Sequence, residues 1–70
     1  MEKINCTDSR YGVEFIENGD SILTIAVIND GESYGGTSYW FTVGHYKTMK
    51  NAVRFAAKKL AMHGLELATS

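Results

Sequence analysis

Three stretches of this chain have hydrophobic patterns typical of β-strands. In residues 11–17 (YGVEFIE) the apolar side chains fall mainly at every second position. Residues 21–28 (SILTIAVI) are rich in β-branched side chains and almost continuously apolar. As a strand, residues 37–44 (TSYWFTVG) would place Tyr39, Phe41 and Val43 on one side and Trp40, Thr42 and Gly44 on the other. Such patterns are typical of β-strands, and a nearly continuous run is typical of a central strand. We therefore expect three strands, with a wide glycine-rich turn at residues 29–36 (NDGESYGG) before the third.

After the third strand the apolar spacing becomes that of a helix. At about 100° per residue, one face gathers Met49, Val53, Ala56 and Leu60, with Ala52 and Ala57 at its margins. Thr48 is placed to cap the N-terminus, because its hydroxyl can accept from the first-turn amides, and Gly64 is a natural stop. The pattern predicts one domain over residues 1–70, an α+β fold with a three-stranded antiparallel sheet packed on one C-terminal helix. Residues 4–6 (INC) and 65–67 (LEL) could each add a short edge strand or a covering tail.

The register of the first hairpin decides which side chains share a face. Asn18-Gly19 is a strong hairpin signal. A two-residue loop made of Asn18 and Gly19 would place Glu14 opposite Leu23, inside an apolar row. A three-residue loop with Gly19 in the left-handed conformation keeps the apolar side chains together and places Glu14 beside Thr24. We therefore expect the three-residue loop.

One helix covers only one face of a sheet, so the other face is a candidate contact surface. An indole or isoleucine side chain left in water costs up to about 2 kcal/mol or more compared with a buried one. Such a patch is typical of association with a macromolecule. The candidate protein-binding residues on this face are Trp40, Ile16, Glu14, Thr24 and Thr42, and Glu17 and Asp20 of the acidic hairpin form a second candidate. Cover by the N-terminal segment and a homodimer are the alternatives.

The charges are segregated along the chain, although the formal net charge is only -1. Seven of the eight carboxylates precede residue 47, and five of the seven basic residues follow residue 46. The helix face opposite the apolar one gathers Lys47, Lys50, Arg54 and Lys58. A solvated face is one interpretation of this set, and contact with nucleic-acid phosphates is the other.

The segment YWFTVGHYKTMKNAVRFAAKKLAMHG resembles the ethylene-response-factor type of DNA-binding domain and is similar to the arm-binding domain of phage-type integrases. Both families place a three-stranded sheet on one helix. The matching residues are Trp40, Tyr46, Thr48, Ala52, Arg54, Ala56, Ala57 and Gly64. Those domains read DNA with arginines and tryptophans of the open sheet face, whereas the same face is expected here to carry carboxylate and threonine side chains beside the indole.

Two further resemblances concern the charged groups. The start of the helix, with Lys47, Lys50 and Asn51, is similar to the last helix of double-stranded-RNA-binding domains, although the first helix of that family has no counterpart here. In size and charge the chain resembles small inhibitors carried by phages, among them anti-CRISPR proteins. That resemblance implies binding to a host nuclease complex with acidic groups in place of nucleic acid. The carboxylates that would suit such mimicry are Glu14, Glu17, Asp20, Asp30 and Glu32.

The sequence offers no pattern that indicates catalysis. His45, His63 and Cys6 have no metal-ligand spacing, and the glycine-rich turn lacks the lysine of a phosphate-binding loop. We expect no enzyme activity, no metal, no cofactor and no membrane span, and the single cysteine favours the cytoplasm. The leading expectation is a small non-enzymatic protein-binding module, an inhibitor or regulator carried by a phage or mobile element. A nucleic-acid-binding domain and a homodimeric structural protein are the alternatives.

Overall fold

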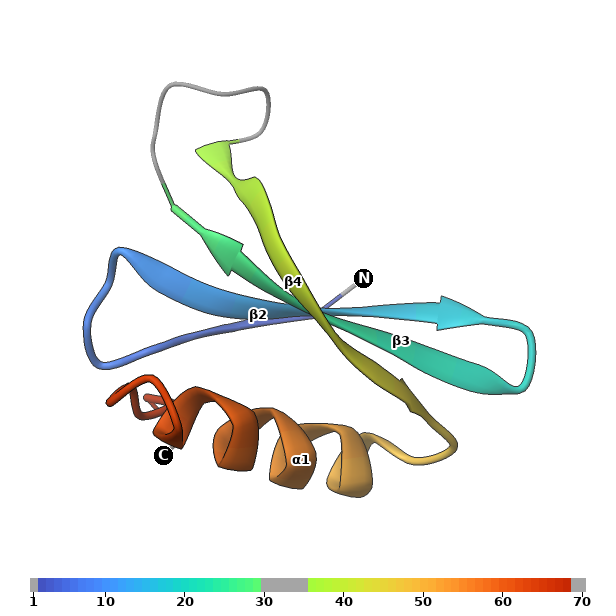
Figure 1. Ribbon diagram of the computed structural model, residues 1–70. Coiled ribbons are helices and arrows are strands. Elements are labelled where there is room, and N and C mark those ends of the chain that lie inside the picture. Colours follow the sequence, from blue (N-terminus) through green and yellow to red (C-terminus); the bar gives the residue numbers. More distant parts are fainter. Residues whose placement is uncertain (1, 30–35, 69–70) are drawn as a thin grey trace.

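The computed structural model describes residues 2–29 and 36–68, and it shows an α+β fold of two layers. A four-stranded antiparallel sheet has the order β1-β2-β3-β4, and a single helix follows the last strand and lies across one face of the sheet (Figure 1). The elements are β1 (Glu2–Asn5), β2 (Tyr11–Asn18), β3 (Ser21–Ile28), β4 (Ser38–Tyr46) and α1 (Met49–Ala61). The predicted sheet on a C-terminal helix is confirmed, and the N-terminal edge strand is β1.

Both chain ends join this sheet. β1 pairs antiparallel with β2, which places Ile4 opposite Val13. Near the other end of the chain, Leu67 forms an isolated antiparallel bridge with Cys6, and the Thr7 amide donates to the Glu66 carbonyl at 2.8 Å. The C-terminal segment therefore packs beside the end of β1, and both Cys6 and Leu67 belong to the buried core.

The predicted register of the first hairpin is wrong. β2 and β3 pair as far as Asn18 and Ser21, so the loop has two residues, Gly19 and Asp20. Gly19 adopts the expected left-handed conformation, with φ of 64°. Glu14 lies opposite Ile25 instead of beside Thr24. Because directly opposite residues share a face, this register turns alternate β3 side chains to the side opposite the one expected.

The consequence for β3 is visible in its burial. Thr24 was expected on the helix-free face, but Thr24 and also Ala26 are fully buried on the helix side. Ala26 faces Val13 across the β2–β3 pair, and Thr24 faces Phe15. The Thr24 hydroxyl donates a long hydrogen bond of 3.4 Å to the Ile22 carbonyl, which gives the buried oxygen a partner within its own strand.

The position predicted for Trp40 is also wrong. The pairing of β3 with β4 shifts twice, and Tyr39 and Phe41 face successive β3 residues with Trp40 between them as the extra residue of a bulge. A bulge reorients its side chains relative to simple alternation. The indole is partly buried against the core and lies 5.1 Å from the Tyr11 ring and 4.9 Å from the His63 ring, measured between centroids. Trp40 therefore packs at the end of α1 and not on the helix-free face.

The helix begins and packs largely as the sequence predicts. Thr48 is the N-cap, and its hydroxyl accepts from the Asn51 amide at 3.2 Å. Ala52, Ala56 and Leu60 are fully buried against the sheet. The helix ends at Ala61, three residues before the expected stop, and Gly64 takes the left-handed conformation in the following turn.

Most of the predicted turn at residues 29–36, including Asp30 and Glu32, lies outside the described residues. At its start, the side-chain amide of Asn29 donates to the Asn5 side-chain oxygen at 3.0 Å and to the Ser9 carbonyl at 2.9 Å. The Lys3 ammonium donates to the side-chain oxygen of Asn29. These contacts connect the end of β3 to β1 and to the turn before β2.

Candidate functional site

The seven candidate protein-binding residues do not form one surface. Glu14, Ile16 and Thr42 lie on the helix-free side of the sheet, as expected. Thr24 is in the core and Trp40 is on the helix side, so neither contributes to that surface. The remaining two, Glu17 and Asp20, are exposed at the β2–β3 hairpin end.

The helix-free side of the sheet, which we call the open face, is more apolar than expected. Its apolar members are Ile16, Leu23, Ile25, Val27 and Tyr39. Val27 is buried, Ile16, Leu23 and Ile25 are partly exposed, and Tyr39 is exposed. Tyr39 is 65% exposed, and its hydroxyl hydrogen-bonds with that of Thr42 at 3.1 Å. Glu14 accepts a hydrogen bond of 3.3 Å from the Thr37 hydroxyl. The open face is thus an apolar strip with polar groups at its sides, and no described residue identifies what would cover it.

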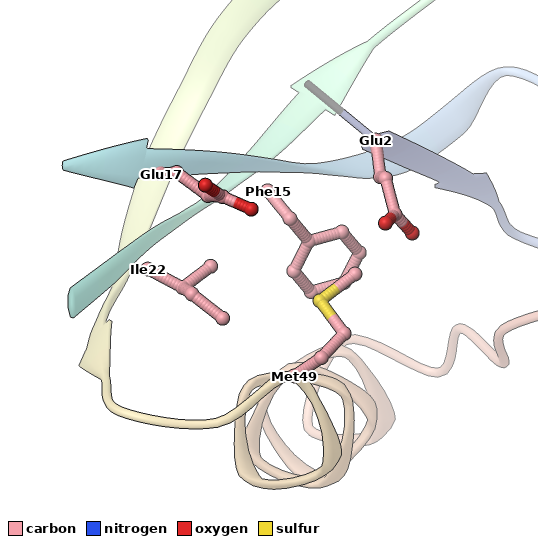
Figure 2. A pocket seen from close by; sticks show the side chains of 5 residues that line it. All are labelled: Glu2, Phe15, Glu17, Ile22 and Met49. Atoms are coloured by element: carbon pink, nitrogen blue, oxygen red, sulfur yellow. The ribbon is translucent and has the colours of Figure 1, made fainter. Parts of the chain in front are cut away.

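A pocket lies on the other side of the sheet, between the hairpin end and the start of α1. Figure 2 shows its five lining residues, which come from four different elements: Glu2 of β1, Phe15 and Glu17 of β2, Ile22 of β3 and Met49 of α1. The pairing of β1 with β2 places Glu2 opposite Phe15, and the β2–β3 pairing places Glu17 opposite Ile22. The register that was mispredicted is therefore what assembles this pocket.

The pocket combines an apolar base with two carboxylates. Phe15 is 3% exposed, and its ring lies beside the Met49 thioether, whereas the Glu2 and Glu17 carboxylates lie on either side of that ring (Figure 2). Both glutamates are exposed to solvent. We call these five residues the acid-rimmed pocket. Its volume is about 120 Å³.

The predicted basic face of the helix is present as expected. Lys50, Arg54 and Lys58 are exposed and lie opposite the buried Ala52, Ala56 and Leu60. Lys47 is exposed just before the N-cap residue. The Arg54 guanidinium lies over the Phe55 ring, with its central carbon 5.0 Å from the ring centroid. The four cations are thus available on the surface, and their binding to nucleic acid stays a prediction.

Two titratable side chains near β1, Cys6 and Asp8, have shifted pKa values with local causes. Cys6 is 2% exposed, and burial, followed by the charge of Asp8, raises the pKa of its thiol. A thiol with a raised pKa is a poor nucleophile at neutral pH. Arg10 donates two side-chain hydrogen bonds to Asp8, and these bonds lower the pKa of the Asp8 carboxyl. Residues 2–29 and 36–68 hold no group of three histidine, cysteine or acidic side chains that could bind a metal ion.

Comparison with known proteins gives no relative. No family model matches the chain, and no curated protein and no solved structure is significantly similar to it. The one described helix is too short and too polar to cross a membrane.

Sequence reasoning selected only one residue of the acid-rimmed pocket, Glu17. Glu2 was missed because the four-residue β1 is mostly exposed and gives little hydrophobic signal. Met49 was assigned to the helix core, and its position as the first residue of α1 places it at the edge of that core. A signal was nonetheless present, since a strand at residues 4–6 extended backwards would bring Glu2 beside β2.

Proposed function

We propose that this chain is a non-enzymatic protein-binding module that receives a lysine or arginine side chain of a partner protein in the acid-rimmed pocket. The observation that carries the proposal is the placement of two carboxylates above an apolar base, in a recess built from four elements. This combination favours a ligand with an apolar stem and a cationic end. Lysine and arginine side chains have that chemistry.

The size of the pocket indicates that a single side chain fits it better than a larger ligand does. Small-molecule and cofactor sites enclose about 300–1,000 Å³. The acid-rimmed pocket, at about 120 Å³, is less than half of the lower limit of that range. That space fits the end of one long side chain and is too small for a nucleotide or a drug-sized substrate.

The binding free energy expected for the pocket is that of one bound lysine or arginine side chain. Each methylene that leaves water contributes about 0.8 kcal/mol. Each exposed carboxylate–ammonium pair adds about 0.2–1 kcal/mol, because solvent screens the charges. A single side chain would therefore bind weakly by itself, and a protein partner would need further contacts. The open face is a second surface for such contacts, and the homodimer expected as an alternative would use it.

A host nucleic-acid-processing complex as target, and an origin in a phage or mobile element, stay predictions from size and charge.

The proposal is tested by titrating the protein with a short capped peptide that has one central lysine, and with matched peptides that have arginine or norleucine in its place. The Met49 methyl and the Phe15 ring are observed by NMR. We expect the lysine and arginine peptides to shift both resonances in a saturable way. Norleucine retains the stem without the charge and should bind more weakly.

Charge-neutral variants test whether peptide binding depends on the carboxylates of the pocket or on the overall acidity of the protein. Glu2→Gln with Glu17→Gln should weaken the binding of the lysine peptide by about 2- to 30-fold, corresponding to the loss of two exposed ion pairs. The matched control is Glu14→Gln with Glu66→Gln, which removes two carboxylates that do not line the pocket. Equal weakening by the two double variants, or equal binding of the norleucine peptide, would contradict the proposal.

A further inference from the structure

The solvent-facing side of α1 carries a row of three cations, Lys50, Arg54 and Lys58, which we call the basic row. Its members are spaced four residues apart, and all are exposed. At about 100° per residue, each is rotated by about 40° from the one before, so the row winds slowly along the helix. The apolar side of the same helix is already buried against the sheet through Ala52, Ala56 and Leu60.

The charges of the basic row are not balanced by nearby carboxylates. The helix itself has no acidic residue. Arg10 with Asp8 is the only ion pair within residues 2–29 and 36–68. Like charges four residues apart destabilise a helix by about 0.2–0.5 kcal/mol per pair. Lys50 in the first turn also opposes the helix dipole. Lys58 in the last turn is favoured by the dipole, so the cost comes from Lys50 and from repulsion along the row, and a polyanionic ligand would recover it.

The dimensions of the basic row match a phosphate backbone. Eight residues separate Lys50 from Lys58, and a rise of about 1.5 Å per residue makes the row about 12 Å long. One strand of a duplex presents a phosphate about every 3.4 Å along the axis, so about three to four phosphates fall within that length. The contact of Arg54 with Phe55, whose ring stacks on Tyr46 at 5.0 Å, restrains the guanidinium in the middle of the row.

The neighbourhood of the row favours a nucleic acid over an anionic membrane. A helix that binds at a membrane interface must insert an apolar face between the lipids, and here that face is occupied by the sheet. Of the apolar side chains beside the row, Met62 is exposed and Phe55 is half-buried, which is less apolar area than the face of a helix that inserts into a membrane. We propose that the basic row binds the phosphate backbone of duplex nucleic acid, without preference for base sequence. This site is separate from the acid-rimmed pocket.

The experiment measures the affinity for short labelled duplexes of random sequence over a salt series by fluorescence anisotropy. Each phosphate contact on duplex DNA contributes about -0.9 to the slope of log affinity against log salt, so three contacts give about -2.7. Duplex DNA and duplex RNA form two arms, because both present the same phosphate chemistry. Binding to either duplex with this slope supports the proposal, and the duplex that binds shows whether the ligand is DNA or RNA. Absence of binding to both at the lowest salt overturns it.

Matched double variants locate the binding surface. Arg54→Gln with Lys58→Gln should reduce the slope to about -0.9, since one contact remains. Lys3→Gln with Arg10→Gln makes the same chemical change outside the helix and should leave the slope unchanged. Equal effects of the two double variants would refute the assignment to α1, as would binding to vesicles of anionic lipid without binding to duplexes. The double variant at Glu2 and Glu17 should retain duplex binding, which distinguishes a failure of this site from a failure of the pocket.

Discussion

Leu60→Ala tests the packing on which both candidate surfaces depend. Leu60 is fully buried and is one of the three side chains that place α1 on the sheet. The substitution removes three carbon atoms, which is about 2.4 kcal/mol of transfer free energy at about 0.8 kcal/mol each. The cavity left behind adds to this, and buried leucines cost about 2–5 kcal/mol when replaced by alanine.

The size of the chain makes this loss large in relative terms. At about 0.05–0.15 kcal/mol per residue, a domain of this length has a free energy of unfolding of about 4–10 kcal/mol. A loss of about 3 kcal/mol is then a third or more of the total. For a domain of this size, each kcal/mol lowers the melting temperature by about 4–8 °C, so we expect a decrease of about 12–24 °C.

Urea denaturation followed by far-UV circular dichroism measures the effect. The midpoint should fall while the slope with denaturant is unchanged, because the surface exposed on unfolding is nearly the same. Met62→Ala is the matched control, since Met62 lies two residues further along and is 78% exposed. It should change stability by less than about 0.5 kcal/mol. A loss below about 1 kcal/mol for Leu60→Ala, or equal losses for both variants, would refute the assigned helix orientation.

Two further predictions concern the backbone of β4 and the buried thiol. Gly44 has φ of 154°, and a Cβ there would lie 2.8 Å from the Tyr46 hydroxyl. Gly44→Ala should therefore lower the free energy of unfolding, measured by urea denaturation, by about 1–3 kcal/mol. An unchanged midpoint would contradict this prediction. Cys6 should react with a disulfide reagent far more slowly in the folded protein than in urea, because burial excludes the reagent and raises the pKa of the thiol. As the pH is raised past the ordinary thiol pKa, the reaction rate of the unfolded chain should level off while that of the folded protein still rises, because burial raises the pKa of the thiol in the folded protein. Equal rates in the two states would show that Cys6 is accessible.

The strands and the helix were predictable because their periods differ. The alternation of residues 11–17 and the helical spacing from Met49 to Leu60 each have one structural interpretation, and β2 and α1 match them within a few residues. The N-cap was predictable for a similar reason, since the Thr48 hydroxyl has a defined local partner in the Asn51 amide. These features are determined by residues close together in sequence.

The faces of the sheet were not predictable in the same way. SILTIAVI is apolar at almost every position, so its pattern does not distinguish the two faces, and the choice depended on the hairpin loop alone. A hydroxyl at Thr24 and a carboxylate at Glu14 suggested the wrong alternative, because a threonine can be buried when its oxygen finds a backbone carbonyl. The bulge at Trp40 arises from pairing with β3 and leaves no local signature in the sequence. For these reasons Trp40 was placed on the wrong face of the sheet, and the acid-rimmed pocket was not predicted.

The first turn of α1 connects the two proposed sites. Met49 lines the acid-rimmed pocket, and the next residue, Lys50, begins the basic row on the other side of the helix. The fixed orientation of the helix therefore places the acidic recess on one side of it and the basic row on the other. The buried alanine and leucine side chains hold this orientation, so the two charged sites stay apart and do not neutralise each other. It follows that a shift of the helix would disturb both sites together, whereas the charge-neutral surface variants should affect one site each. Combined loss in Leu60→Ala with separate losses in the surface variants would fit this arrangement, and it would not fit one shared electrostatic surface.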